Sequence, residues 1–423
     1  MQIQKPKGTY DLTPAKAFQR TYLENSIRNI FDRFNYKEIR TPTFEQTKLF
    51  QRSIGEETDI VSKEMYSFND GEFTLKPEMT APVIRAYVEN RLYNESPMQK
   101  LYYISNMFRR ERPQAGRFRE FSQFGAECIG SSDFTSDAEM IVLADTILKE
   151  LGISDYSIRI NTIGSPEERK RFTDSLKDFL KPRFESLSAE TKRRFEKNPL
   201  RILDTKDTGD LDLLKDAPAL SDYLNEETLD HFSRLTGLLD SLEVKTVKDP
   251  RLVRGFDYYT STTFEFTSDS LGAQNSLLGG GRYDLLAGQL GAKDTPAIGF
   301  AAGFERLEMA LASASVNPKE AADIVLFICS ADEGARNEVL KMISDIRKAG
   351  IKCETDLIGR SVKSQMKEAD RQKARYTMVI GERELQIDSA EIRRMKDGNI
   401  RNVSGLANII NYLKDENQAG QAR

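Results

Sequence analysis

The sequence has one histidine, three cysteines and no tryptophan among its 423 residues. A catalytic serine or cysteine that needs a general-base histidine would have to use His231, which lies in a segment without a nucleophile motif. We therefore expect His231 to be an ordinary residue on the surface of a helix. Because histidine is nearly absent, the chemistry of an active site would fall to arginine, carboxylate and tyrosine side chains.

The three cysteines, Cys128, Cys329 and Cys353, are far apart and form no CxxC pair, so neither a disulfide framework nor a zinc site is predicted. Such cysteine usage fits a reducing cytoplasm. No stretch approaches the roughly 18 apolar residues of a membrane helix, and the first residues lack the apolar region of a secretory signal. The net charge of −4 argues against non-specific coating of nucleic acid, but it allows local basic patches.

A chain of this length needs two or three domains. We predict a first helix over 14–34, opened by Pro14, and another over 137–151, ended by Gly152. Strands and helices that occur in blocks indicate an α+β domain on an antiparallel sheet over residues 1–312. The other expected elements are strands at 37–42, 65–75, 101–129 and 257–266, a helix at 81–91, a helical insertion at about 165–242, a glycine-rich turn at 278–283 and a final helix at 299–312.

Residues 313–320 are small and polar with one proline, and we interpret them as a linker. Beyond them, over residues 321–423, strands alternate with helices, which predicts a small α/β domain with a mostly parallel sheet. Its expected strands are 323–330, 351–355 and 376–380, its helices are 335–348 and 361–373, and its tail from 416 to 423 should fray. The basic residues Lys363, Lys367 and Arg371 share one helix face, which suits either phosphate binding or plain solvation.

The segment 107–127 reads as strand, polar loop, strand. Side chains that alternate along its strands bring a cation, carboxylates, an aromatic ring and an amide onto shared faces. These are Arg109, Glu111, Phe121, Gln123 and Glu127. Such a set suits a charged planar ligand such as a nucleotide, although a solvated hairpin has the same composition. In the loop, Gln114 and Arg117 could reach phosphates or a base edge.

Two further clusters pair charged side chains with other polar or flexible groups. Glu78 and Thr80 flank Met79, and a carboxylate beside a hydroxyl suits either an ammonium ligand or the capping of the next helix. Arg254 precedes Gly255, so a guanidinium sits on flexible backbone and could approach a phosphate; an amphipathic strand is the other interpretation.

The glycine run 279–281, before Arg282 and Tyr283, permits close approach of the backbone to a ligand, as does any flexible turn. It lacks the spacing and the lysine of a phosphate-binding P-loop. The run 297–307 passes from strand to helix and contains Arg306, which an ordinary solvated helix would also explain.

Taken in order, these segments resemble the motifs of the histidyl-tRNA synthetase family, within class II aminoacyl-tRNA synthetases. Segment 109–127 resembles class II motif 2, 299–307 resembles motif 3, and 39–50 resembles motif 1, which lies at the dimer interface in that class. Segments 254–259 and 279–284 resemble two peptides peculiar to the histidine enzymes. The resemblance covers nearly the whole chain and implies a class II antiparallel catalytic sheet with a helical insertion and a C-terminal α/β anticodon-binding domain.

The resemblance also implies an activity: ATP-dependent activation of L-histidine and its transfer to tRNA(His) by a cytoplasmic homodimer. Mg²⁺ would accompany ATP, and no protein ligand of the metal is implied. Arg109 would hold the α-phosphate, Glu111 and Phe121 the adenine, and Arg306 the γ-phosphate. Arg254 would stabilise charge at the α-phosphate, and Gln114 and Arg117 would meet the acceptor end of tRNA. The histidine-binding residues would be Glu78, Met79, Thr80 and Gln123, with Glu127, Tyr258, Tyr259 and Tyr283 around the imidazole.

Physical chemistry agrees with these implied roles. Charge develops on the α-phosphoryl oxygens as the adenylate forms, and fixed arginines there lower the barrier. The Glu127 carboxylate can accept a hydrogen bond from one imidazole nitrogen, and the neighbouring phenol of Tyr259 can donate one to the other. Phe256, Ser122 and Phe304 differ from the residues that are most common at these positions in the family, which leaves the detailed shape of the pocket open.

Three other functions remain open at this stage. A non-catalytic regulatory subunit of ATP phosphoribosyltransferase typically lacks the anticodon-binding domain, whereas this chain keeps that domain together with Arg254 and Tyr259. A class II synthetase for proline, threonine or glycine would not need the imidazole-directed Glu127. A purely structural RNA-binding module would not need the arginines at 109, 254 and 306 together.

Overall fold

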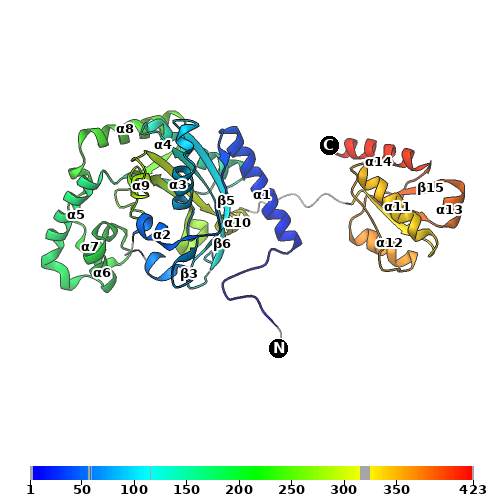
Figure 1. Cartoon of the computed structure of the whole chain (residues 1–423), viewed down its shortest axis with the longest axis horizontal. Coiled ribbons are helices and arrows are strands. Elements are labelled where there is room, and N and C mark those ends of the chain that lie inside the picture. Colours follow the sequence, from blue (N-terminus) through cyan, green and yellow to red (C-terminus); the bar gives the residue numbers. More distant parts are fainter. Residues whose placement is uncertain (1–2, 56–57, 59, 115, 315–323, 422–423) are drawn as a thin grey trace. The chain divides into compact units, whose positions relative to one another are not determined.

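The computed structural model describes residues 3–55, 58, 60–114, 116–314 and 324–421, and the chain forms two compact units, 1–318 and 319–423 (Figure 1). All but the first two residues of the predicted linker, 313–320, lie outside the described residues, as does the start of the strand predicted at 323–330.

An antiparallel sheet forms the centre of the first unit. Among the described residues it has eight strands, and only the edge pairs β1–β5 and β7–β8 are parallel. This confirms the predicted class II sheet. In spatial order the strands are β1 (Lys37–Glu38), β5 (Gln99–Phe108), β6 (Glu120–Ile129), β11 (Ala297–Gly303), β10 (Ser276–Arg282), β9 (Thr260–Thr267), β7 (Ser157–Thr162) and β8 (Thr246–Lys248).

The two faces of this sheet are used differently. Apolar side chains on one face, such as Phe124, Phe264 and Phe300, pack against helices and form the main hydrophobic core. The helices are α1 (Pro14–Arg33), α4 (Phe134–Glu150), α8 (Glu226–Ser241) and α10 (Phe304–Ser313). The opposite face meets α3 (Thr80–Glu89) and carries a second cluster rich in buried tyrosines. Polar groups on this second face can therefore gather around a ligand while the first face supplies stability.

The segment between β7 and β8 is helical. Its helices are α5 (Pro166–Leu180), α6 (Ala189–Lys197), α7 (Thr208–Leu213) and α8, joined by the 3-10 turns η3 (Lys181–Ser186), η4 (Pro199–Asp204) and η5 (Leu220–Tyr223). Ser165 and Glu168 form a capping box that starts α5, and Asn225 caps α8. Helices α5, α6 and α7 lie together beside the sheet, whereas α8 runs along α4 (Figure 1).

Smaller elements complete the first unit. Strands β2 (Phe44–Gln46), β4 (Phe73–Leu75) and β3 (Tyr66–Phe68) form a separate antiparallel sheet in that order. The remaining elements are α2 (Thr47–Ile54), the π-helical turn η1 (Ile60–Glu64), η2 (Leu92–Asn94), η6 (Asp269–Gln274) and α9 (Leu286–Gln289).

The glycine-rich segment 278–283 is not the turn that we predicted. Residues up to Arg282 belong to β10, a central strand paired on both sides. A Cβ on Gly280 would lie 2.1 Å from the carbonyl oxygen of Gly299, so glycine here serves the close approach of neighbouring strands. The helix predicted from Gly299 was also wrong in its start, because β11 occupies 297–303 and α10 begins at Phe304.

The second unit has a mixed sheet, in the order β13 (Cys353–Thr355), β12 (Leu326–Ser330), β14 (Tyr376–Ile380), β15 (Ser389–Arg394) and β16 (Ile400–Ser404). The first three strands are parallel and the last two antiparallel, so "mostly parallel" describes only half of the pairings. Its helices are α11 (Ala335–Lys348), α12 (Val362–Arg371), α13 (Glu382–Ile387) and α14 (Leu406–Gln421). Helix 335–348 and strand 376–380 are confirmed to the residue.

The predicted fraying from residue 416 was wrong as far as Gln421, because α14 continues to that residue. Glu416 Oε2 accepts hydrogen bonds from Tyr376 Oη at 2.6 Å and from Arg394 Nη2 at 3.1 Å. These bonds fix the helix to the sheet of its own unit.

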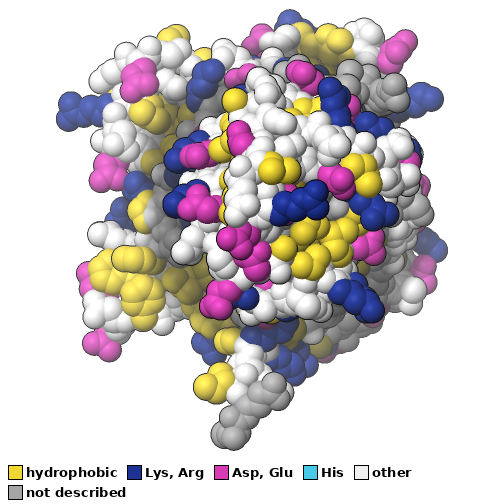
Figure 2. All heavy atoms as spheres, turned by 90° about the vertical axis from the view of Figure 1, so that its right-hand side faces the viewer, with side chains coloured by type: hydrophobic (Ala, Val, Ile, Leu, Met, Phe, Trp, Pro, Cys, Tyr) yellow, Lys and Arg dark blue, Asp and Glu magenta, His cyan; other side chains and the backbone are white. Residues whose placement is uncertain are grey.

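Two further properties of the structure bear on function. Within the part of the chain that the structure describes, no helix is both long and apolar enough to cross a bilayer. Figure 2 shows one face of the molecule, where basic and acidic side chains are interspersed with apolar patches rather than gathered into a field of one sign. This face fits the expectation that any contact with nucleic acid is local.

A buried ion pair joins the sheet to the helices behind it. Asp137 on α4 is fully buried, and its Oδ1 forms an ion pair with Arg282 Nη2 at 2.6 Å. Its Oδ2 accepts hydrogen bonds from Arg282 Nε at 3.0 Å and Thr262 Oγ1 at 2.7 Å, and it lies 2.9 Å from His231 Nε2. His231 was expected on a helix surface, but its side chain is only 21% exposed and ties α8 to α4. Asp137 thereby holds β9, β10 and α8 in register with α4.

We expect Arg282→Met to lower the free energy of unfolding by about 3–5 kcal/mol, because it leaves the Asp137 carboxylate buried without its cation. The matched control is Arg33→Met on α1, which breaks an exposed ion pair with Glu150 of α4, the helix that carries Asp137. This change should lower the free energy of unfolding by about 0–1 kcal/mol. Urea unfolding followed by circular dichroism measures both. Equally small losses of unfolding free energy in both variants would show that the buried Asp137 carboxylate does not need the charge of Arg282.

Candidate active site

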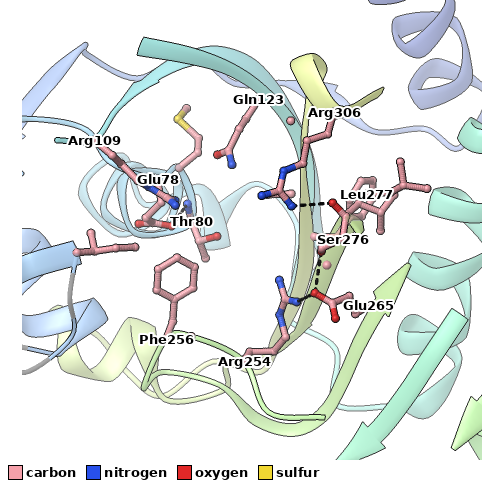
Figure 3. A pocket seen from close by; sticks show the side chains of 18 of the residues that line it. Glu78, Thr80, Arg109, Gln123, Arg254, Phe256, Glu265, Ser276, Leu277 and Arg306 are labelled. Carbon is pink, nitrogen blue, oxygen red and sulfur yellow. Dashed lines mark hydrogen bonds and ion pairs between the residues drawn. The ribbon is translucent and has the colours of Figure 1, made fainter. Parts of the chain in front are cut away.

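A pocket of about 530 Å³ opens on the tyrosine-rich face of the sheet, within the roughly 300–1,000 Å³ usual for ligand sites. Its walls come from the start of α3, the loop after β5, strands β6, β9, β10 and β11, and the peptide 252–259. Residues of the helical insertion close one side. Figure 3 shows the charged side chains that converge on it.

The floor of the pocket is made of small residues in adjacent strands. Gly279 on β10 pairs with Ala301 on β11, which pairs with Gly125 on β6. In the next row Gly281 pairs with Gly299. Because side chains of one face stand two residues apart along a strand, these rows leave the centre of the sheet bare on the pocket side.

Two charged side chains occupy the space that these glycines leave. A Cβ on Gly279 would lie 2.3 Å from Arg254 Nη2, and a Cβ on Gly299 would lie 1.7 Å from Glu127 Oε2. A Cβ at Gly279 would have to displace the guanidinium of Arg254, and a Cβ at Gly299 would meet both Glu127 and the carbonyl oxygen of Ala126, at 2.6 Å. The observed positions of both side chains therefore require glycine beneath them.

Glu127 lies directly behind the pocket wall. Its carboxyl is buried and accepts hydrogen bonds from Thr80 Oγ1 at 2.9 Å and from Tyr283 Oη. Both partners line the pocket, whereas Glu127 itself is not among the lining residues. Loss of solvation on burial raises the pKa of Glu127 to about 8, although the two hydroxyls lower it in part.

Aromatic rings surround the same end of the pocket. The rings of Tyr258 and Tyr259 have centroids 4.8 Å apart, and Tyr258 meets Tyr283 edge to face at 5.7 Å. Tyr103 is also buried there, and its hydroxyl occupies the space above Gly125. This end therefore combines an apolar enclosure with several hydroxyl groups, as a small aromatic ligand requires.

Glu78 combines the two interpretations that the sequence left open. Its carboxylate accepts from the backbone amides of Thr80 at 2.8 Å and Ala81 at 2.9 Å, so it does cap α3. It also lines the pocket with Met79 and Thr80, and burial raises its pKa. Nearby, Gln123 Oε1 has no hydrogen-bond partner among the described residues. A ligand donor would satisfy that oxygen.

Arg109, Arg254 and Arg306 enter the pocket from different elements, and each donates a hydrogen bond to an acceptor of its own. Arg109 Nε donates to the carbonyl of Pro77 at 2.8 Å, Arg254 Nη1 donates to Glu265 Oε1 at 2.6 Å, and Arg306 Nη1 donates to the carbonyl of Ser276 at 2.8 Å. Arg109 lies on one side of the pocket, and Arg254 and Arg306 on the other (Figure 3).

The surroundings of these arginines favour an anionic, planar ligand. Arg109 lies over the ring of Phe121 at 5.2 Å. Burial lowers the pKa of Arg306, and the charge of Arg117 lowers it further. An anion bound between them would offset this cost. Arg254 Nε has no hydrogen-bond partner among the described residues, so it remains available to a ligand.

The loop after β5 reaches the mouth of the pocket. Glu111 Oε2 lies 3.3 Å from Arg117 Nη1, and both residues line the pocket. Gln114 bonds to the backbone of Arg117 but is not among the lining residues. The structure thus brings every site residue predicted from the sequence to the pocket wall, except Glu127, which lies behind it, and Gln114.

Sequence reasoning missed several lining residues. Tyr103 stands opposite Gly125 in the β5–β6 pair, so the register of that hairpin was a usable signal. Glu265, the partner of Arg254, had no such signal. Three residues come from the insertion and could not have been found without its orientation: Arg201, Asp204 and Lys206.

Comparisons with known proteins agree over both units. A family profile described as "Histidyl-tRNA synthetase" matches residues 8–307, and one described as "Anticodon binding domain" matches 323–416. The curated "Histidine--tRNA ligase" of Halothermothrix orenii is 45% identical over 98% of this chain and 99% of its own length. That of Clostridium botulinum is 45% identical over 94% and 96%. The crystal structure of apo S. aureus histidyl-tRNA synthetase has a TM-score of 0.83 and 33% identity, and covers 98% of this chain and 100% of its own.

Glu127 should make stability depend on pH. Its carboxyl keeps a proton up to about pH 8 in the folded state and loses it near 4.5 when unfolded. The contribution to stability is therefore full below about pH 4.5 and is lost as the pH rises to about 8. Glu127→Gln has no such proton, so its melting temperature relative to the parent should rise steadily from pH 5 to 8. Calorimetry at several pH values measures this, and a constant difference would contradict it.

Proposed function

The chain belongs to the histidyl-tRNA synthetase family and is a histidine–tRNA ligase, and from its pocket we propose how individual residues divide the reaction. The family implies ATP, histidine and tRNA as substrates. The proposal rests on one observation above all: three fixed arginines enter the same pocket whose far end is lined by tyrosines and backed by a buried carboxyl.

ATP would occupy the half of the pocket near motif 2. Arg109 would hold the α-phosphate, and Phe121, beneath its guanidinium, would stack on the adenine. Glu111 would accept from the adenine amino group. Arg306 would hold the γ-phosphate, which suits its loss of solvation by supplying an opposite charge. Arginine fits these roles because its planar fork matches phosphate oxygens.

Arg254 would act in the chemical step. As the histidine carboxylate attacks the α-phosphorus, negative charge grows on the phosphoryl oxygens and pyrophosphate leaves. A guanidinium fixed in advance stabilises that charge without reorganising. Glu265 supplies the fixation by accepting from Nη1, and Nε stays available for the phosphate.

Histidine would bind at the tyrosine-rich end. Glu78, Thr80 and Gln123 would hold its α-ammonium, with Met79 beside them. Tyr258, Tyr259 and Tyr283 would surround the imidazole. Glu127 would accept from an imidazole nitrogen once the hydroxyls of Thr80 and Tyr283 move aside, because they now occupy its oxygens.

Transfer to tRNA would use groups outside the pocket centre. Gln114 and Arg117, in the loop at the mouth, would meet the acceptor end of tRNA(His). In the second unit Lys363, Lys367 and Arg371 are exposed on α12, and we propose that this face contacts phosphates of the anticodon stem.

Magnesium would accompany ATP and would neutralise part of the charge on its phosphates. This cation needs few protein ligands when phosphates and waters supply most of its shell. The described residues hold no cluster of three or more metal-ligating side chains, which fits that arrangement, and no step above depends on the metal. A cytoplasmic location fits the three cysteines, which are all buried and free.

The assay for both activity and mechanism is exchange of pyrophosphate into ATP with each standard amino acid separately. We expect exchange with histidine only. Gly279→Ala should lower kcat by about 100-fold, because its methyl group displaces Arg254 from the charge it stabilises. Gly237→Ala, whose Cβ would meet nothing within 4 Å, is the control. Exchange with another amino acid would reassign the pocket, and exchange with none would favour the regulatory-subunit alternative.

We also propose a homodimer formed through the small sheet near motif 1. Phe44 and Phe68 are 49% and 43% exposed, and the ring centroids of Phe44, Phe68 and Phe73 lie within 6.0 Å of one another. An exposed apolar patch of this kind marks a surface that binds another protein chain.

Sedimentation velocity should therefore give a dimer mass, and Phe44→Ser with Phe68→Ser should shift it toward the monomer. The control is Leu357→Ser with Ile358→Ser, which removes apolar side chains that are 76% and 77% exposed in the second unit. A monomeric parent protein, or equal shifts in both double variants, would contradict this interface.

A further inference from the structure

The helical insertion contacts the peptide that carries Arg254 and Tyr259. Arg169, in the first turn of α5, donates through Nη1 to the backbone carbonyl of Tyr259. Asn198, between α6 and η4, donates through Nδ2 to Asp257 Oδ1 at 2.7 Å. Side chains of the insertion thus hold two points of a peptide that lies more than fifty residues further along the chain.

The Tyr259 carbonyl lies where the peptide enters β9, and the backbone there is unusual. Ser261 has a φ of 49°, in the left-handed region that residues with a side chain rarely adopt. Ile163 donates to the Ser261 carbonyl at 2.8 Å, and Ser261 donates to the Gly164 carbonyl at 3.1 Å. The conformation of Ser261 sets the direction of the chain before it, and the bond from Arg169 fixes the carbonyl on that side.

In the middle of the peptide the Phe256 ring is packed, whereas the residues on either side of it are weakly held. Gly255 and Asp257 are exposed, and a Cβ on Gly255 would meet no atom within 4 Å. Within the described residues, the backbone amide of Asp257 makes a single long bond, of 3.4 Å, to the carbonyl of Ile54. Contacts from outside the peptide, such as the one from Asn198, therefore matter more than they would in a packed strand.

Arg169 is also placed at a cost. Burial lowers its pKa, and the nearby charges of Asp257 and Glu167 offset only part of that effect. A charged side chain that is partly desolvated in order to reach one carbonyl makes a strong, directional hydrogen bond there.

We propose that Arg169 is a positioning residue for histidine activation: through the Tyr259 carbonyl it orients Tyr259 and Arg254, with Asn198 as a second support. The proposal rests on the roles proposed above for Tyr259 and Arg254. It makes the insertion a working part of the amino-acid site, independent of any contact that the insertion has with tRNA.

The test is pyrophosphate exchange, which contains no tRNA, on the full-length protein. Arg169→Gln should raise the KM for histidine about 10-fold or more, because a hydrogen bond from a charged donor is worth about that factor. The KM for ATP should change far less, since Arg109, Phe121 and Arg306, which are proposed to bind ATP, lie on other elements. A change in the orientation of Arg254, which is proposed to act on the α-phosphate in the chemical step, would lower kcat instead. Arg169→Lys, which keeps a charged donor, should restore part of the loss. Asn198→Ala should raise the KM for histidine by a smaller factor.

Arg171→Gln is the matched control. Arg171 lies on the same helix and donates through Nη2 to the carbonyl of Tyr223 at 2.9 Å, so it makes the same kind of bond within the insertion. Its KM for histidine should equal that of the parent. Calorimetry should show similar melting temperatures for both glutamine variants, and if Arg169→Gln does not fold, the lysine and Asn198 variants decide the question.

Three results would overturn the proposal: an unchanged KM for histidine in Arg169→Gln, an equal rise in Arg171→Gln, or normal exchange with a loss confined to tRNA charging. The last would mean that the insertion acts on tRNA alone. Failure of the parent protein to exchange with histidine is a different outcome, because it would remove the proposed function itself.

Discussion

Arg254 can lie across the sheet only because β10 has no side chain beneath it. A Cβ on Gly279 would lie 2.3 Å from its guanidinium, and a Cβ on Gly299 would lie 1.7 Å from the Glu127 carboxyl. The cation proposed for the phosphate and the carboxyl proposed for the imidazole therefore require the same bare floor. Glycine weakens a strand, because it adds backbone entropy and packs nothing. The phenylalanines on the opposite face of the sheet, packed into the main core, offset that weakness.

Arg109, Arg254 and Arg306 differ in how their charge is balanced. Arg109 and Arg306 donate to neutral backbone carbonyls, and the ion pair of Arg109 Nη1 with Glu111 Oε1 is long, at 3.8 Å, so both keep most of their positive charge for a ligand. Arg254 is paired with Glu265, so it adds little to the net field. It can still act in the reaction, because a fixed dipole aimed at developing charge needs no net charge to stabilise it. The first two thus suit binding of the phosphates, and the third suits the chemical step.

Local sequence signals predicted the elements that are decided locally. Helix 335–348 has clear helical periodicity and strand 376–380 a short apolar run, and both were located to the residue. The run at 279–281 was misread because glycine marks both turns and close strand contacts, and only the neighbouring strands decide between them. The position of His231 depended on Asp137, 94 residues away. Glu127 was found by its strand face, but that face could not reveal that Thr80 and Tyr283 stand in front of it.

The helical insertion is joined directly to the strands that lie beside the site. It leaves the sheet at the end of β7 and returns at β8, and β7 pairs with β9 through Thr162 and Thr262. Beyond that pair, the residues that lead into the insertion bond to Ser261, where β9 turns toward the pocket. A rotation of the insertion would therefore act first on the backbone next to Tyr259. Because β7 pairs directly with β9, the insertion reaches this peptide without crossing an intervening strand.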